Sequence, residues 1–231
     1  MTLEDRVRAA LGTVYDPELD EPITTLGFVG ACTVSAGGEV AVRLRLPTPQ
    51  CAPNFAYLMA ADAQAAVLGL PEVSGVSVVL EDHYTGAEIN AALARGGGFD
   101  DAFPGETTGS LDALRELFRR KALVARQARV CRALLDAGAT PDEVVELRLG
   151  DLPDGDDARR CDELRGALGL PQAPEDPALI AGDGTALTAE QLPNWLRRAR
   201  LMTLSLETNG ELCRSLLHVR YGCPESEEVA A

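Results

Sequence analysis

The chain has 231 residues, 46% of them hydrophobic, which is long for one small domain and suits two. Its net charge of -15 argues against nucleic-acid binding, because neutralising phosphates requires clustered cations. No apolar run approaches the roughly 18 to 20 residues that cross a bilayer, and residues 1–6 lack the basic start and apolar core of a signal peptide. We therefore expect a cytoplasmic protein with neither nucleic acid nor membrane as a partner.

The N-terminal part of the chain predicts a helix that ends before a turn. Thr2 is a suitable N-cap, and Val7 and Leu11 keep the spacing of one helix face. Asp16 stands directly before Pro17, and a residue in that position is pushed out of the helical region. The same pair is also typical of a residue that starts a turn.

An alpha-beta-beta-alpha-beta order follows from the next elements. Residues 28–35 and 39–46 read as strands joined by the glycine turn at 36–38, and the second strand alternates apolar and polar side chains. An alanine-rich helix is predicted over about 54–68 and another strand over 73–80. Together with the first helix, these elements predict a small domain of the α+β class.

One cysteine, Cys51, lies in a proline-stiffened loop between the second strand and the alanine-rich helix. A helix N-terminus carries partial positive charge and unsatisfied N–H groups, which favour a thiolate over a thiol. Cys51 is therefore placed to bind a soft metal or to attack an electrophile. The alternative is that Cys51 is a small buried residue near a strand end, a common fate of free cysteine.

His83 follows the last predicted strand of this domain, in the stretch Glu81-Asp82-His83-Tyr84. Side chains at a strand end can point toward a site, and imidazole with carboxylates suits iron or zinc. His83 is therefore a candidate metal ligand. The alternative is a histidine that caps or hydrogen-bonds near the edge of the sheet.

Three ordered motifs carry a resemblance to a known family: residues 14–18 (VYDPE), 23–29 (ITTLGFV) and 48–51 (TPQC). Over about residues 3–95 the chain resembles the MIP-eighteen or SufT-type iron-sulfur assembly domain. The resemblance implies that Asp16 and Glu18 are the family's acidic pair, that Thr48 supports the loop and that Cys51 is the reactive cysteine. It also implies transient binding of iron or an iron-sulfur cluster, with Asp16 and Glu18 ordering the loop or supplying a hard ligand.

The resemblance implies a metallocentre assembly or maturation factor without enzymatic turnover and without catalytic residues. Its partners would be a client apo-metalloprotein or the assembly machinery, and a homodimer that shares a cluster is one arrangement this allows. Because one member of the family serves a di-iron oxygenase, both an iron-sulfur protein and a di-iron oxygenase are candidate clients.

Two other functions stay open at this stage. One is an adaptor or chaperone-like protein that binds an apo-enzyme and never touches metal, with Cys51 structural. The other is a thiol enzyme in which His83 acts as the base for Cys51. The thiol enzyme lacks a third orienting group at a recognisable spacing.

The rest of the chain predicts a mainly helical C-terminal domain. Glycines over 96–109 interrupt helix formation and mark a linker between residues 1–95 and 110–231. A long helix to about 136 carries many arginines, either as a solvated face or as a docking surface. Short helices follow, with Trp195 as the expected anchor of their core, and capping-box patterns at 188–191 and 208–211 predict two helix starts.

Cys213, His218 and Cys223 form a second metal candidate at spacing Cys-x4-His-x4-Cys. Five residues along a helix rotate by about 140 degrees, so Cys213 and His218 would not share a helix face. A metal site here therefore requires the helix to end between them. Otherwise Cys213 is a core cysteine and His218 a surface histidine.

The linker is tested by limited proteolysis. We expect cleavage within residues 96–109 to release a folded N-terminal fragment, because glycine and polar residues there leave little to bury. Mass spectrometry identifies the cut, and circular dichroism reports whether the fragment is folded. A chain that resists cleavage there, or that loses all structure when cut, has one continuous core instead.

Overall fold

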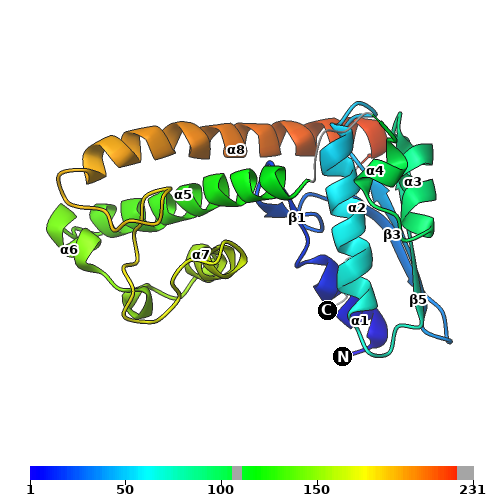
Figure 1. Cartoon of the computed structure of the whole chain (residues 1–231), viewed down its shortest axis with the longest axis horizontal. Helices are drawn as coiled ribbons and strands as arrows, with labels where there is room; N and C mark the ends of the chain where they lie inside the picture. The colour runs from blue at the N-terminus through cyan, green and yellow to red at the C-terminus, as the bar shows by residue number, and fades with distance from the viewer. Residues whose placement is uncertain (106–110, 223–231) are drawn as a thin grey trace. The chain divides into compact units, whose positions relative to one another are not determined.

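The computed structural model describes residues 1–105 and 111–222 (Figure 1). These residues form two compact units. The first comprises Met1–Leu111 together with Thr208–Ala231, and the second comprises Asp112–Glu207. The predicted domain boundaries differ from this division at the C-terminal end, because the sequence assigns all of 110–231 to the helical domain.

The first unit confirms the α+β class, with a three-stranded sheet of order β3-β4-β5. β3 (Val29–Val34) pairs antiparallel with β4 (Glu39–Arg45), and β4 pairs parallel with β5 (Gly75–Glu81). The remaining elements are α1 (Leu3–Leu11), β1 (Tyr15–Asp16), β2 (Glu21–Pro22), α2 (Pro53–Leu68), α3 (Gly86–Ala94) and α4 (Phe99–Ala102). The parallel pair matters for function, because the segments that follow β4 and β5 emerge at the same edge of the sheet.

Local chemistry explains these elements. Thr2 and Asp5 form a capping box at the start of α1. In β4, Val40, Val42 and Leu44 are buried while the residues between them are exposed, as the alternation predicts. Gly38 has φ of +81° in the β3–β4 turn, and a Cβ there would lie 2.5 Å from the Glu72 carbonyl oxygen, so only glycine fits.

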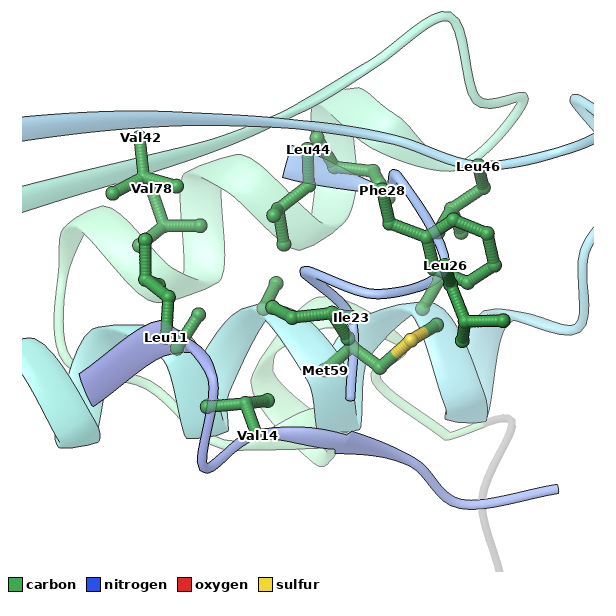
Figure 2. Packing of buried hydrophobic residues seen from close by; sticks show 14 of the residues in the cluster. Leu11, Val14, Ile23, Leu26, Phe28, Val42, Leu44, Leu46, Met59 and Val78 are labelled. Atoms are coloured by element: carbon green, nitrogen blue, oxygen red, sulfur yellow. The ribbon is translucent and has the colours of Figure 1, made fainter. Parts of the chain in front are cut away.

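One hydrophobic core joins the sheet to the helices of this unit. Figure 2 shows Val42 and Leu44 of β4 and Val78 of β5 facing Leu11 of α1 and Met59 of α2. Further core side chains come from the segment between β1 and β3: Ile23, Leu26 and Phe28. The core thus holds in place the segments on either side of the candidate site.

The last turns of α8 (Leu192–Tyr221), residues 208–221, also belong to the first unit. Leu217 is 7% exposed within the same core cluster. Arg214 forms an ion pair with Glu21 at 2.6 Å, and Arg220 donates hydrogen bonds to the carbonyl oxygens of Leu46 and Asp82 at 3.1 and 2.7 Å. These contacts tie the end of α8 to segments far away in the sequence.

The second unit is mainly helical. It contains α5 (Asp112–Asp136), α6 (Pro141–Glu146), the 3-10 helix η1 (Leu149–Asp151), α7 (Asp156–Ala167) and the first part of α8. Trp195 is partly buried against the small core cluster that contains Cys131 and Leu192. Arg126 and Arg129 of the arginine-rich helix pair with Asp157 of α7 at 2.9 and 3.0 Å, so part of that basic face is used inside the unit.

The predicted helix start at 208–211 is wrong, because α8 runs without a break from Leu192 to Tyr221. A capping box marks a helix start only where the residues before it are not helical. The residues before Thr208 already belong to α8. The pattern at 188–191 does form, with Thr188 and Gln191 exchanging side-chain to backbone hydrogen bonds. No helix within residues 1–105 and 111–222 has the length and apolar composition needed to cross a membrane.

The packing of the α8 end is tested by a pair of alanine variants. Leu217→Ala should lower the free energy of unfolding of the first unit by about 2 to 4 kcal/mol, because it leaves a cavity in the core. Val219→Ala is the matched control: the side chain is 82% exposed on the same helix, so the change should stay within about 0.5 kcal/mol. Urea unfolding followed by circular dichroism measures both, and equal effects would contradict this packing.

Candidate functional site

Cys51 lies between β4 and α2 in a short turn. Its backbone N–H donates to the carbonyl oxygen of Thr48 at 3.4 Å, and the Thr48 hydroxyl lies 3.5 Å from the Cys51 sulfur. α2 then begins at Pro53, with Ala52 as an N-cap that offers no side-chain acceptor and with no acidic residue in the first turn. The half-buried thiol therefore lies just before a helix N-terminus that has no acidic side chain in its first turn.

The turn after β5 holds the Cys51 loop from the other strand. His83 Nε2 lies 2.7 Å from the Cys51 carbonyl oxygen, and the backbone N–H of Tyr84 donates to the Pro49 carbonyl oxygen at 3.1 Å. A carbonyl oxygen only accepts, so Nε2 carries the proton, and Nδ1 is free to accept from the Thr85 N–H at 3.3 Å. Burial lowers the pKa of His83, which favours this neutral form.

His83 thus fixes the backbone of Cys51 rather than contacting its sulfur. Both ring nitrogens take part in hydrogen bonds, so a metal at either nitrogen would have to displace one of them. The bond to the carbonyl oxygen also differs from what a general base for Cys51 needs, which is contact with the thiol itself. The arrangement matches the alternative of a histidine that hydrogen-bonds at the edge of the sheet.

Asp16 is buried, and it organises the turn between β1 and β2. Its Oδ1 accepts the backbone N–H groups of Glu18 at 2.8 Å and Leu19 at 2.9 Å. Burial raises the pKa of Asp16 to about 6, against the opposing effect of these two hydrogen bonds. Glu18 of the same turn is exposed. Asp16 therefore acts as a turn former whose charge is costly to bury.

Cys213, in the end of α8, belongs to the same unit as Cys51. The half-buried side chain packs against the same core cluster as Cys51. Burial raises the pKa of the Cys213 thiol to about 11, and Asp16, Cys51 and Glu18 add to the shift in the same direction. The sequence placed Cys213 in a separate candidate site. The available signal was the apolar series Cys213, Leu217 and Tyr221, which marks one buried helix face at spacings of four residues.

The second metal candidate does not come together around His218. α8 continues through both Cys213 and His218, so the helix end that this site requires is absent, and His218 is exposed. Cys223 lies outside the described residues. Within residues 1–105 and 111–222 no group of three or more His, Cys, Asp or Glu side chains is arranged to hold a metal ion by itself.

Comparison with known proteins identifies the N-terminal part of the chain. The model of a family described as "Iron-sulfur cluster assembly protein" matches residues 4–78, which include Asp16, Glu18, Thr48 and Cys51. An uncharacterized protein of Methanocaldococcus jannaschii is 33% identical over 93 residues, which cover 40% of this chain and 96% of that protein. No solved structure matches the chain.

The buried carboxyl group predicts a pH dependence of stability. The pKa of Asp16 in the folded state is raised from its usual value of 3.8 to about 6. The contribution of Asp16 to the free energy of unfolding is therefore fully present below pH 3.8 and is lost as the pH rises through about 6. Asp16→Asn keeps an acceptor oxygen for the turn but carries no charge. Above pH 7 we expect the variant to be more stable than the unchanged protein, by about 3 kcal/mol at most.

Urea unfolding between pH 4.5 and 8 measures this difference. Asp154→Asn, which removes an exposed carboxylate in the second unit, is the control and should leave the pH profile unchanged. If Asp16→Asn is destabilising to the same degree at every pH, burial of the charged carboxylate does not destabilise the folded state. The raised pKa of Asp16 is then wrong.

Proposed function

The chain belongs to the iron-sulfur cluster assembly protein family, and we propose that it binds iron or an iron-sulfur cluster transiently through Cys51 and passes it to a client apo-metalloprotein. The observation that carries the proposal is the Cys51 loop, in which a half-buried thiol is held by hydrogen bonds from the turn after β5. The family consists of assembly factors rather than catalytic enzymes, in keeping with a carrier role.

The chemistry of the loop supports a cysteine that binds cargo. Iron in clusters is bound mainly by cysteine sulfur, and Cys51 lies directly before the N-terminus of α2. The Thr48 hydroxyl lies 3.5 Å from that sulfur and restricts its position. Hydrogen bonds to the carbonyl oxygens of Pro49 and Cys51 fix the backbone, so little conformational entropy is lost when cargo binds.

A single loop thiol supports transfer rather than storage. A stable cluster takes about four thiolates, so cargo on Cys51 must complete its coordination elsewhere, from a client or from a second copy of the chain. Incomplete coordination makes the cargo labile, as delivery requires. Asp16 and Glu18 would act here by ordering the turn beside the loop, a role supported by the two backbone hydrogen bonds that Asp16 accepts.

One observation favours a second candidate, an adaptor that binds an apo-enzyme without touching metal. No ready-made group of three or more metal ligands occurs in the part of the chain that the structure describes. An adaptor would need the folded unit and its surface but not the Cys51 thiol. The two functions therefore differ in their response to a change of this one sulfur.

Anaerobic reconstitution with ferrous iron and sulfide tests the proposal. We expect substoichiometric, labile iron in the unchanged protein, and transfer of a cluster to an apo-ferredoxin used as a model client. Cys51→Ser should abolish both iron retention and transfer, because the hydroxyl is a far weaker ligand for iron. Cys32→Ser is the matched control, a half-buried cysteine on β3 of the same unit, and should keep both.

The outcome separates the two functions. If Cys51→Ser retains transfer while its fold is unchanged by circular dichroism, cargo binding through Cys51 is wrong. Should the same variant still activate a natural client, the adaptor function is supported.

A further inference from the structure

The chain turns sharply after β5, at Asp82. This residue has φ of +51°, in the left-handed region that a residue other than glycine adopts at a cost in energy. His83 follows directly, and its Nε2 donates to the Cys51 carbonyl oxygen at 2.7 Å. The hydrogen bond from the His83 ring to the Cys51 loop therefore depends on whether Asp82 keeps its turn conformation.

The end of α8 holds Asp82 at two points. The guanidinium of Arg220 donates to the Asp82 carbonyl oxygen at 2.7 Å, and the Tyr221 hydroxyl donates to the Asp82 carboxylate at 3.1 Å. The same guanidinium donates to the carbonyl oxygen of Leu46, directly after β4, at 3.1 Å. One side chain of α8 thus joins the two segments that leave the parallel strands.

The Tyr221 ring is itself held in place. The guanidinium carbons of Arg45 and Arg220 lie 5.0 and 4.9 Å from the ring centroid, within the range of cation–π attraction. Arg45 of β4 also pairs with Glu81, the last residue of β5, at 2.7 Å. The helix end therefore meets an ordered group of charged side chains at this edge of the sheet.

We infer that Arg220 and Tyr221 are positioning residues for the Cys51 site. They hold the turn at Asp82, and that turn brings the His83 ring to the Cys51 carbonyl oxygen. Neither side chain touches the cargo, because both act through the backbone of the loop. The inference rests on the proposed function of Cys51, and it gives residues outside the family match a part in that function.

The hydrogen bond of His83 provides a readout that needs no metal. A ring nitrogen that donates to a carbonyl oxygen keeps the proton on Nε2, and ¹⁵N chemical shifts of the ring distinguish this tautomer. Arg220→Ala should give a mixture of tautomers at His83. It should also speed hydrogen exchange of the Tyr84 amide, which donates to the Pro49 carbonyl oxygen, by at least about tenfold, because a bond from a charged donor is lost.

Three further variants separate positioning from general loosening of the helix end. Tyr221→Phe keeps the ring but loses the hydroxyl, so a smaller change in the same direction is expected. Arg220→Lys keeps the charge without the planar fork of donors and should recover part of the effect of Arg220→Ala. Arg214→Ala is the control, because Arg214 pairs with Glu21 at 2.6 Å on the same helix end, and it should leave both signals unchanged. Circular dichroism checks that every variant is folded.

Anaerobic reconstitution with ferrous iron and sulfide connects the loop to its cargo. Arg220→Ala should bind iron at least about tenfold more weakly, as is typical when groups that orient a metal ligand are removed, and Arg214→Ala should match the unchanged protein. Unchanged His83 and Tyr84 signals in Arg220→Ala overturn the inference, and so does a loosened loop that binds iron normally. If the unchanged protein itself retains no iron while Arg220→Ala still loosens the loop, the proposed function is wrong and the positioning of the loop stands.

Discussion

Parallel pairing of β4 with β5 is the constraint on which the site depends. It brings the ends of the two strands to one edge of the sheet, where the hydrogen bond from His83 to the Cys51 carbonyl oxygen links the segments that follow them. Arg220 adds a bridge across the same edge, because its guanidinium donates both to Leu46 after β4 and to Asp82 after β5. Its planar fork of donors suits two carbonyl oxygens on separate segments. The Cys51 loop is therefore fixed by the sheet rather than by its own prolines alone.

The site carries a local cost to stability. Asp16 is buried, and its pKa is raised to about 6, so near neutral pH the native state holds a charge that would be better hydrated. Two backbone N–H groups offset part of this cost and define the turn. The core beneath, to which Ile23 and Leu26 contribute, supplies the apolar burial that keeps the turn in place. Such a local cost is typical of positions kept for chemistry rather than for folding.

Much of the first unit follows from local patterns in the sequence, and much of the site does not. The alternation of Val40, Val42 and Leu44 and the glycine turn at 36–38 were sufficient to predict β3 and β4, and the motif around Cys51 predicted the loop. The bond of His83 to a backbone carbonyl oxygen was one of two alternatives, since residue type alone does not say which atom an imidazole meets. The packing of Cys213 against the core of the first unit depends on tertiary contacts across a long sequence separation. Helical periodicity reveals that a face is buried but not which core buries it.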